Sequence, residues 1–155
     1  MIEEVILFLG ADPGISGAIV ALDQHGKYYS HIRGDGTGTD MWKMLYDEWC
    51  CDEGTMCFGL IERVSSMPAQ GVSSTFKFGV SYGFLQGMFI AAGIRHEFIS
   101  PVKWQTVMKC RTGGDKNITK AMAQRLFPSV KVTHRIADAL LIAELARRMA
   151  LERGL

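Results

Sequence analysis

The chain has 155 residues, of which 48% are hydrophobic and 21% are charged, and its formal net charge is +1. These values exclude an intrinsically disordered chain, and the length predicts one domain, over residues 1–155, with a proper hydrophobic core. The most apolar stretch, residues 84–94, is too short to cross a bilayer, and no signal-like segment precedes the first predicted strand, so we expect a cytoplasmic protein without a membrane partner.

Five segments have the composition of β-strands. They span residues 5–11, 18–23, 27–32, 56–61 and 95–99. The first and fourth are apolar throughout, as strands buried on both faces are. The second and third flank the turn Gln24-His25-Gly26 and predict a hairpin.

Periodicity and capping residues predict five helices. They span residues 41–51, residues 73–92, residues 101–108, a segment from Asp115 or Asn117 to just before Phe127-Pro128, and a segment from about 135 into the basic C-terminus. Residues 34–40 are predicted to form a loop, and residues 68–71 a turn. The second helix carries glycines and apolar residues at helical spacing, namely Phe76, Gly79, Val80, Gly83, Phe84 and Gly87. We expect these residues to pack against the sheet, and a dimer face is the alternative.

The order of these segments, β-β-β-α-β-α-β-α-α-α, predicts a ribonuclease-H-like α/β fold, with a five-stranded mixed sheet flanked by helices. A right-handed crossover places the fourth strand beside the first and parallel to it. Asp12 and Glu62 end these two strands, and Asp138 lies near the start of the last helix, so the three carboxylates are expected to converge. Because Mg²⁺ prefers oxygen ligands, this pattern predicts a two-metal site for phosphodiester cleavage.

Charge is distributed unevenly along the chain. Residues 1–62 carry eleven acidic and three basic side chains, whereas residues 95–135 carry nine basic and two acidic ones. A basic segment of this kind indicates a polyanionic partner such as DNA, because each Lys or Arg near a phosphate releases a condensed counterion. The alternative interpretation is a solvated helix face.

The four cysteines are Cys50, Cys51, Cys57 and Cys110. They have neither a C-x-x-C spacing nor a companion histidine cluster, which argues against a zinc site. We expect reduced thiols, and a Cys50–Cys51 redox pair is the alternative.

Several motifs, spread in order along the chain, carry a family resemblance. They are Gly10-Ala11-Asp12-Pro13-Gly14-Ile15-Ser16-Gly17-Ala18, Ile61-Glu62-Arg63-Val64 with Met67-Pro68, Ser100-Pro101-Val102-Lys103-Trp104, Gly114-Asp115-Lys116 leading to Leu126-Phe127-Pro128, and Ala137-Asp138-Ala139-Leu140. With these motifs the chain resembles the RuvC-type Holliday-junction resolvases of the ribonuclease-H-like (retroviral-integrase) superfamily, and most of all their compact bacteriophage branch. The resemblance implies a homodimeric, Mg²⁺-dependent endonuclease with one RuvC-like nuclease domain. Such an enzyme nicks four-way junctions and other branched DNA symmetrically, in the cytoplasm of a bacterial host.

The resemblance also implies roles for individual residues. Asp12, Glu62 and Asp138 match the family's acids, which hold two Mg²⁺ ions that Mn²⁺ can replace, and Lys116 matches the lysine near the cleavage site. His134 lies one turn before Asp138 on the same helix face, so it is a candidate metal ligand or water-orienting residue. A surface histidine is the alternative.

DNA contacts are expected from nine residues, Arg63, Met67, Gln70, Lys77, Lys103, Lys109, Arg111, Lys116 and Lys120. The family bears a lysine just after the position of Trp104, where this chain has Gln105, so we expect Lys103 or Lys109 to make that phosphate contact. Met67-Pro68 is predicted to hold unstacked bases apart at the junction centre. Alternatively, these two residues only pack the loop onto its own domain.

Two other functions fit part of the pattern. The segment Asp12-Pro13-Gly14-Ile15-Ser16-Gly17 is similar to the phosphate loop of actin-like ATPases and sugar kinases. Those proteins close two such lobes on a nucleotide, and this chain has the length of one. A non-catalytic module that binds branched DNA explains the basic segment but gives no reason for three acids at the ends of strands and helices.

Overall fold

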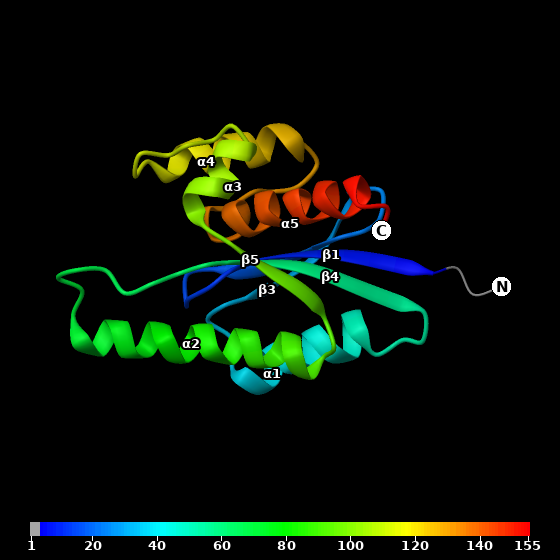
Figure 1. Cartoon of the computed structure of the whole chain (residues 1–155), viewed down its shortest axis with the longest axis horizontal. Coiled ribbons are helices and arrows are strands. Elements are labelled where there is room, and N and C mark those ends of the chain that lie inside the picture. Colours follow the sequence, from blue (N-terminus) through cyan, green and yellow to red (C-terminus); the bar gives the residue numbers. More distant parts are fainter. Residues whose placement is uncertain (1–3) are drawn as a thin grey trace.

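The computed structural model describes residues 4–155, which form a five-stranded mixed sheet with helices on both faces (Figure 1). The strands are β1 (Val5–Asp12), β2 (Ala18–Leu22), β3 (Tyr28–Arg33), β4 (Thr55–Glu62) and β5 (Arg95–Ile99). Their order in the sheet is β3-β2-β1-β4-β5, with β1 antiparallel to β2 and parallel to β4. The predicted ribonuclease-H-like α/β fold is confirmed, including the place of the fourth strand beside the first.

Helical segments follow β3, β4 and β5. They are α1 (Gly38–Lys43), the π-helix η1 (Met44–Cys50), α2 (Val72–Ala91), α3 (Pro101–Val107), α4 (Lys116–Leu126) and α5 (His134–Glu152). Figure 1 shows α3, α4 and α5 on one face of the sheet and α1 and α2 on the other. Side-chain caps begin α3 and α4 as predicted: Ser100 accepts a hydrogen bond from the Lys103 amide, and Asp115 accepts one from the Asn117 amide.

The first helix begins earlier than predicted. The Thr37 hydroxyl accepts a hydrogen bond from the Asp40 amide at 3.1 Å and caps α1, so the end of the predicted loop 34–40 is helical. From Met44 onward the backbone widens into the π-helix η1. Apolar periodicity does not distinguish a π-helix from an α-helix, because Leu45 and Trp49 are buried in the core in either case.

Two hydrophobic cores lie on opposite faces of the sheet. The larger joins α5 to strand residues such as Phe8 and Leu60, and the smaller joins α2 and η1 to residues such as Leu9 and Ile61. Alternate residues of β1 and β4 thus point to opposite faces and are buried on both. Across residues 4–155, the helices are all too short or too polar to span a membrane.

The packing of α2 differs from the prediction. Its three buried residues are Leu85, Met88 and Phe89. Phe76 is 71% exposed and Val80 is 56% exposed. A β-carbon added to any of three glycines would meet no atom within 4 Å, namely at Gly79, Gly83 and Gly87. The prediction that these residues pack against the sheet is therefore wrong, because they lie on the side of the helix that faces away from it. Among the predicted packing residues of α2, Phe84 differs from the others, because its ring lies beside the backbone of Gly38 at the start of α1.

Candidate active site

Asp12 and Glu62 lie side by side at the carboxyl ends of β1 and β4. The parallel register of the two strands runs up to the residues immediately before them, and neighbouring strands are about 4.8 Å apart. Side chains two residues apart point to the same face of a sheet, so Asp12 shares the face of Gly10 and Glu62 shares that of Leu60. Leu60 belongs to the core under α5, and both carboxylates therefore point toward α5.

Asp138 joins the group from the second turn of α5. The helix lies directly on β1 at Gly10, where a β-carbon would overlap the Ala139 carbonyl oxygen and the Ala143 amide nitrogen. Gly10 is two residues before Asp12, and Ala139 is the residue after Asp138. This close approach explains why a glycine is required in the middle of an apolar strand, and it brings Asp138 to the end of β1 that carries Asp12.

The three carboxylates share one electrostatic environment. Burial, as the largest cause, and the charges of Glu62 and Asp138 together raise the pKa of Asp12 from its ordinary 3.8 to about 8, against the lowering effect of Lys116. Burial also raises the pKa of Glu62, against the lowering effect of a hydrogen bond from Trp104. Crowding several acids in a partly buried place is unfavourable unless a proton or a cation is bound. The site is therefore built to accept positive charge.

Trp104 holds Glu62 in place, a role that the sequence did not reveal. Its side chain extends from α3 into the core, where the fully buried indole donates through Nε1 to Glu62 Oε2 at 2.6 Å. A signal was present, because a buried indole N–H needs an acceptor. The acceptor was not identifiable, since the two residues are 42 positions apart. The bond fixes the orientation of the carboxylate and favours its ionised form.

Arg135 clamps the turn that follows Asp12. Its Nη1 donates to the Ile15 carbonyl oxygen at 2.7 Å and to the Gly17 carbonyl oxygen at 3.4 Å, and its Nη2 contacts Asp35 at 3.3 Å. Arg135 therefore ties the turn after β1 to the same helix that carries Asp138. This role of Arg135 was not predictable from the sequence, because its partners lie 100 or more positions away along the chain.

The two remaining predicted catalytic residues lie at the margin of the site. Lys116 is the first residue of α4 and is exposed. Its positive charge lowers the pKa of Asp12 and of Glu62 against the larger effect of burial. His134 is the first residue of α5 and is exposed, one turn before the partly buried Asp138. Its role as a metal ligand stays a prediction.

The donor chemistry of the site fits Mg²⁺. All three converging side chains offer carboxylate oxygens, and the raised pKa of Asp12, caused first by burial and then by neighbouring acids, marks a negative potential that a cation would relieve. Within residues 4–155, no three His, Cys, Asp or Glu side chains are already gathered at metal-binding distances. Asp12, Glu62 and Asp138 are the residues that would hold such a cation.

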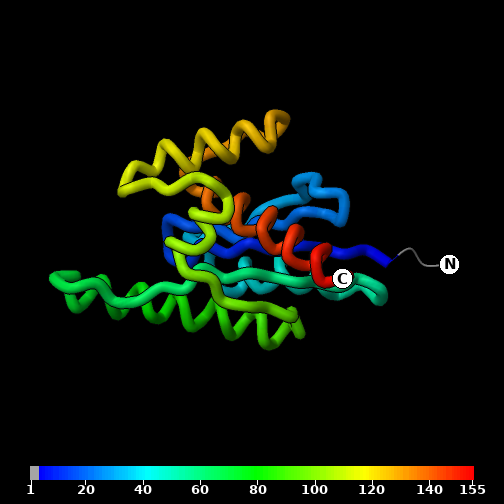
Figure 2. Tube along the Cα trace, turned by 45° about the horizontal axis from the view of Figure 1, so that its top comes forward, coloured from blue at the N-terminus to red at the C-terminus, as the bar shows by residue number. Residues whose placement is uncertain are grey.

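The predicted DNA-binding residues lie on two segments near the acid site. Figures 1 and 2 show the loop 63–71 and the turn 111–115 extending from the same end of the molecule, beyond the carboxyl ends of β1 and β4. The loop and the start of α2 carry Arg63, Met67, Gln70 and Lys77. The segment from α3 to α4 carries Lys103, Lys109, Arg111, Lys116 and Lys120. All nine are exposed except the last, which is partly buried.

Two adjoining hollows separate the loop 63–71 from the turn after β1. One, of about 410 Å³, is lined by polar residues such as Ser16, Lys77 and Arg135 and by the apolar Ile15 and Phe78. The other, of about 320 Å³, is lined in part by Arg63, Met67 and Gln70. Phe78 contributes to both hollows. Three basic side chains, Arg63, Lys77 and Arg135, thus line the two hollows together with apolar residues.

The tip of the loop 63–71 is held by its own hydrogen bonds. The Met67 amide donates to Gln70 Oε1 at 3.2 Å. The Met67 side chain is 68% exposed. The turn is therefore closed by Gln70, and most of the Met67 side chain is left free to contact another molecule.

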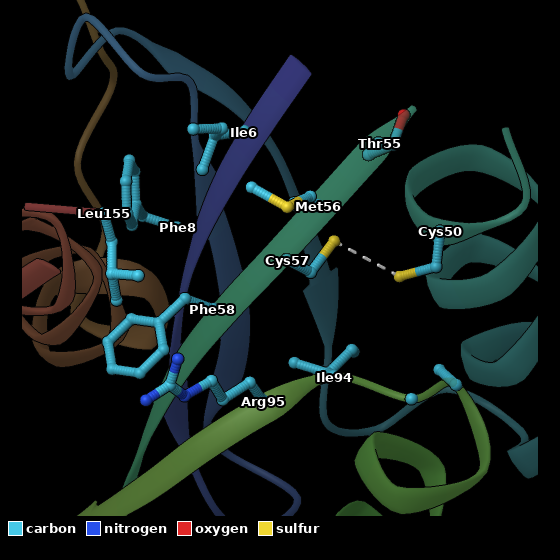
Figure 3. Close-up of a pocket in the computed structure, with 12 residues that line it drawn as sticks. Ile6, Phe8, Cys50, Thr55, Met56, Cys57, Phe58, Ile94, Arg95 and Leu155 are labelled. Carbon is cyan, nitrogen blue, oxygen red and sulfur yellow. Dashed lines mark hydrogen bonds between the residues drawn. The ribbon is translucent and has the colours of Figure 1, made fainter. Parts of the chain in front are cut away.

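A third hollow, of about 320 Å³, lies at the opposite ends of β1 and β4 (Figure 3). It is lined mainly by apolar residues such as Ile6 and Met56, with Cys50 and Cys57, whose sulfur atoms are 3.5 Å apart. The thiol beside Cys50 is therefore that of Cys57. The redox pair that the sequence offered as an alternative was Cys50–Cys51. No acidic side chain lines this hollow, and it is separate from the acid site.

The fold is similar to that of RuvC from Thermus thermophilus. The free RuvC structure superposes with a TM-score of 0.60 at 15% sequence identity, over 97% of this chain and 96% of that one. The structure of T. thermophilus RuvC in complex with a Holliday-junction substrate superposes with a TM-score of 0.57 at 14% identity, over 98% and 97% of the two chains. No protein-family model matches the sequence, and no match was found among curated proteins. The likeness confirms the ribonuclease-H-like fold, and membership of the bacteriophage branch stays a prediction.

Proposed function

We propose that this protein is a Mg²⁺-dependent endonuclease that resolves four-way DNA junctions, and cuts other branched DNA, by paired symmetric nicks. The observation that carries the proposal is the group formed by Asp12, Glu62 and Asp138, in which burial and like charge raise the pKa of Asp12 to about 8. The likeness in fold to RuvC, a protein whose structure is known with a Holliday junction, supports it. We assign this activity to one nuclease domain, over residues 1–155, that acts in the cytoplasm of a bacterial host.

The acid residues bind and position the reacting groups. Asp12, Glu62 and Asp138, with His134 as a fourth ligand, would hold two Mg²⁺ ions, or Mn²⁺ in their place. When bound, the ions supply a more acidic water and stabilise the leaving oxygen. Trp104 keeps the Glu62 carboxylate oriented and ionised through its hydrogen bond of 2.6 Å. Lys116 offsets the negative charge that builds up on the scissile phosphate.

The exposed basic residues around the acid site bind the DNA backbone, because phosphate contacts fix position without reading sequence. Met67, at the tip of the loop 63–71, separates unstacked bases at the junction centre. A four-way junction has approximate two-fold symmetry, so paired cuts are made most simply by two copies of the chain related by the same axis. The working form is therefore a homodimer.

The experiment compares Mg²⁺-dependent cleavage of labelled four-way, three-way and linear DNA by the wild-type protein and by Asp12→Asn, Glu62→Gln and Asp138→Asn. We expect the wild type to nick the four-way junction, and each variant to lose at least about 10³-fold in rate while it still binds the junction. Asp47→Asn, in η1 on the other face of the sheet, is the matched control and keeps full activity. Full cleavage by any of the three variants contradicts the metal-site assignment. Binding without cleavage by the wild type would instead identify a non-catalytic junction-binding module.

A further inference from the structure

Two cysteine side chains meet in the apolar hollow at the ends of β1 and β4 opposite to the acids, which the proposed function does not use. Cys50 is the last residue of η1, and Cys57 is the third residue of β4. Figure 3 shows the two side chains pointing toward one another, with their sulfur atoms 3.5 Å apart. Neither side chain is fully buried, so two thiols in contact are within reach of a small molecule in solution.

The hollow reaches the cysteines because the sheet is incomplete beside Cys57. β5 pairs with β4 only from Phe58 onward, where Phe58 lies opposite Arg95. In the described part of the chain no strand pairs with Cys57 on that side, and the connection from α2 to β5 lines the hollow there instead. With a volume of about 320 Å³, the hollow is large enough to admit part of a small organic molecule.

Cys50 and Cys57 do not have the partners of a metal centre. Of the side chains that line the hollow only Arg95 is charged, and none is a histidine or a carboxylate. Over residues 4–155, no group of three or more His, Cys, Asp or Glu side chains could hold a metal ion, whereas a structural zinc site needs four ligands. Two thiols in contact without further ligands are instead placed for oxidation to a disulfide.

The two thiols differ in acidity, which gives them different parts in such a reaction. A hydrogen bond between the two side chains lowers the pKa of Cys50, against the opposing effect of burial. The same hydrogen bond, and then burial, raises the pKa of Cys57. The thiolate is the attacking form of cysteine, so Cys50 is the nucleophile. Cys57 keeps its proton and donates it in a hydrogen bond to the Cys50 sulfur.

The other two cysteines are less suited to react, although one of them is more exposed. Desolvation and then the charge of Asp52 raise the pKa of the Cys51 thiol. Cys110 is buried in the core, and burial raises its pKa to about 11. The pair is therefore distinguished by the contact between its sulfur atoms and by the acidity of one thiol, and not by exposure.

We propose that Cys50 and Cys57 form a reversible redox site, at which a small disulfide molecule oxidises the two thiols to a Cys50–Cys57 disulfide. The Cys50 thiolate attacks one sulfur of the oxidant and forms a mixed disulfide, and the other half of the oxidant leaves as a thiolate. Cys57 then loses its proton, and its sulfur attacks the Cys50 sulfur and displaces the second half. The pair thus loses two electrons and two protons, and the oxidant gains them and becomes two small thiols.

The disulfide ties the end of η1 to β4. Its sulfur atoms must approach from 3.5 Å to about 2.05 Å. Cys50 ends η1, and helix ends are the parts of a helix that fray, so the adjustment is made there. The bond closes the segment 50–57 into a loop and stabilises the fold by restricting the unfolded chain. In a reducing cytoplasm such a bond is transient, so the site responds when the oxidant accumulates.

Mass spectrometry of the reduced full chain, treated with oxidised glutathione, tests the inference without DNA or metal. We expect the wild type to lose two hydrogen atoms and to keep no glutathione. Cleavage after Glu53, which lies between the two cysteines, should leave the two fragments joined. Cys51→Ser is the matched control and should form the same bond at a rate within about twofold of the wild type, whereas Cys50→Ser should be at least about tenfold slower.

Removal of Cys57 separates the two steps. In the Cys51→Ser background, Cys57→Ser should stop at the mixed disulfide, so the chain carries one glutathione on Cys50. Cys57→Ala repeats the trap without adding a hydroxyl group, and circular dichroism verifies that both variants fold. A wild type that carries glutathione on Cys51 and forms no bond between its own cysteines contradicts the inference. So does a bond that joins Cys50 to Cys51.

Thermal unfolding measures whether the bond ties η1 to β4. We expect the oxidised Cys51→Ser variant to melt roughly 5 °C above its reduced form, and dithiothreitol to restore the lower value. Cys50→Ser, treated in the same way, should show no difference. Equal melting temperatures of the oxidised and reduced forms, or a bond that dithiothreitol does not reverse, overturn the inference. Since none of these measurements uses DNA, their outcome and that of the nuclease test are independent.

Discussion

The helices α5 and α2 cover opposite faces of one sheet (Figure 1), and they differ in how far they are buried. Of the 19 residues of α5, eleven are buried, whereas of the 20 residues of α2 only three are. Both helices are rich in apolar side chains, so composition alone does not account for the difference. The cause is a further layer, because α4 packs on α5 while no described segment covers the side of α2 that faces away from the sheet.

Small residues consequently have different surroundings in the two helices. In α5, Ala139 and Ala143 lie against Gly10, so the helix is pressed onto β1 and Asp138 is held near Asp12. In α2, Gly83 and its neighbours contact nothing in the same copy. The buried helix therefore fixes the position of an acidic side chain. The exposed helix leaves its small residues without contacts in the same copy of the chain.

The largest expected effect comes from comparing two glycine-to-alanine substitutions, one on each side of the sheet. Gly10→Ala forces a β-carbon into the backbone of α5, and we expect it to lower the free energy of unfolding by about 3 kcal/mol or more. Gly83→Ala should raise it by about 0.5–1 kcal/mol, because it removes a helix-weakening glycine from open space. Urea unfolding measures both, and similar effects of the two substitutions would contradict the comparison.

The next effect is a dependence of stability on pH that comes from the α5 side of the sheet. Asp12 has a pKa of about 8 in the folded protein, raised first by burial, against an ordinary value of 3.8. Between these values the folded protein keeps a proton that the unfolded chain has lost. The free energy of unfolding should therefore fall, by on the order of a few kcal/mol, as pH rises from about 4 to about 8 without Mg²⁺.

Urea unfolding at a series of pH values measures this slope. Asp12→Asn should remove most of it, because the amide does not titrate, and Mg²⁺ at pH 8 should restore stability to the wild type only. Ser73→Ala, on exposed α2, should keep the wild-type slope. A wild-type stability that does not change between pH 4 and pH 8 would contradict the electrostatic account of the site.

A smaller effect distinguishes two buried indoles on opposite faces of the sheet. Trp104 donates to Glu62 at 2.6 Å, and Trp49 donates to the Ser30 hydroxyl at 2.8 Å. Trp104→Phe removes a donor that lowers the pKa of Glu62 against burial. We expect it to slow junction cleavage roughly tenfold and to move the acidic limb of the pH–rate profile to higher pH. Trp49→Phe should leave that limb unchanged, and equal shifts would assign Trp104 a merely structural role.

The smallest expected effect belongs to His134. Its position one turn before Asp138 predicts that His134→Ala slows cleavage by roughly tenfold or less, with little change in junction affinity. His134→Asp should retain more activity than His134→Ala, because oxygen suits Mg²⁺ better than nitrogen does. Single-turnover rates and gel-shift titrations on the same junction measure the two effects. Unchanged turnover in His134→Ala would place it among ordinary surface residues.

The sequence predicted the sheet and the positions of the acids because both follow from local patterns. Apolar runs, turn residues and the handedness of the crossover determine the strand order, and Asp12 and Glu62 lie at the ends of those runs. The contacts that hold the site were not predictable. Trp104 and Arg135 reach partners 42 and more than 100 positions away, and no local pattern encodes such pairs.

The packing of α2 differs from the prediction for a related reason. Apolar residues occur on more than one side of this helix, so the pattern does not determine which of them face the sheet. Phe76 and Val80 were expected against the sheet, and they face outward because Leu85 and Met88 already fill that contact. A hydrophobic pattern thus does not by itself identify the side of a helix that packs against the sheet.

The joint claim of an acid site and a two-fold dimer can be tested with a supercoiled plasmid that extrudes a cruciform, in the presence of Mg²⁺. Two nicks made within the lifetime of one complex convert the plasmid to a linear form, whereas a single nick gives an open circle. We predict linear product from the wild type, mainly open circle from an equimolar mixture of wild type and Asp12→Asn, and uncut plasmid from Asp12→Asn alone. Linear product from Asp12→Asn alone would contradict the account. So would a wild type that gives only open circles at every concentration.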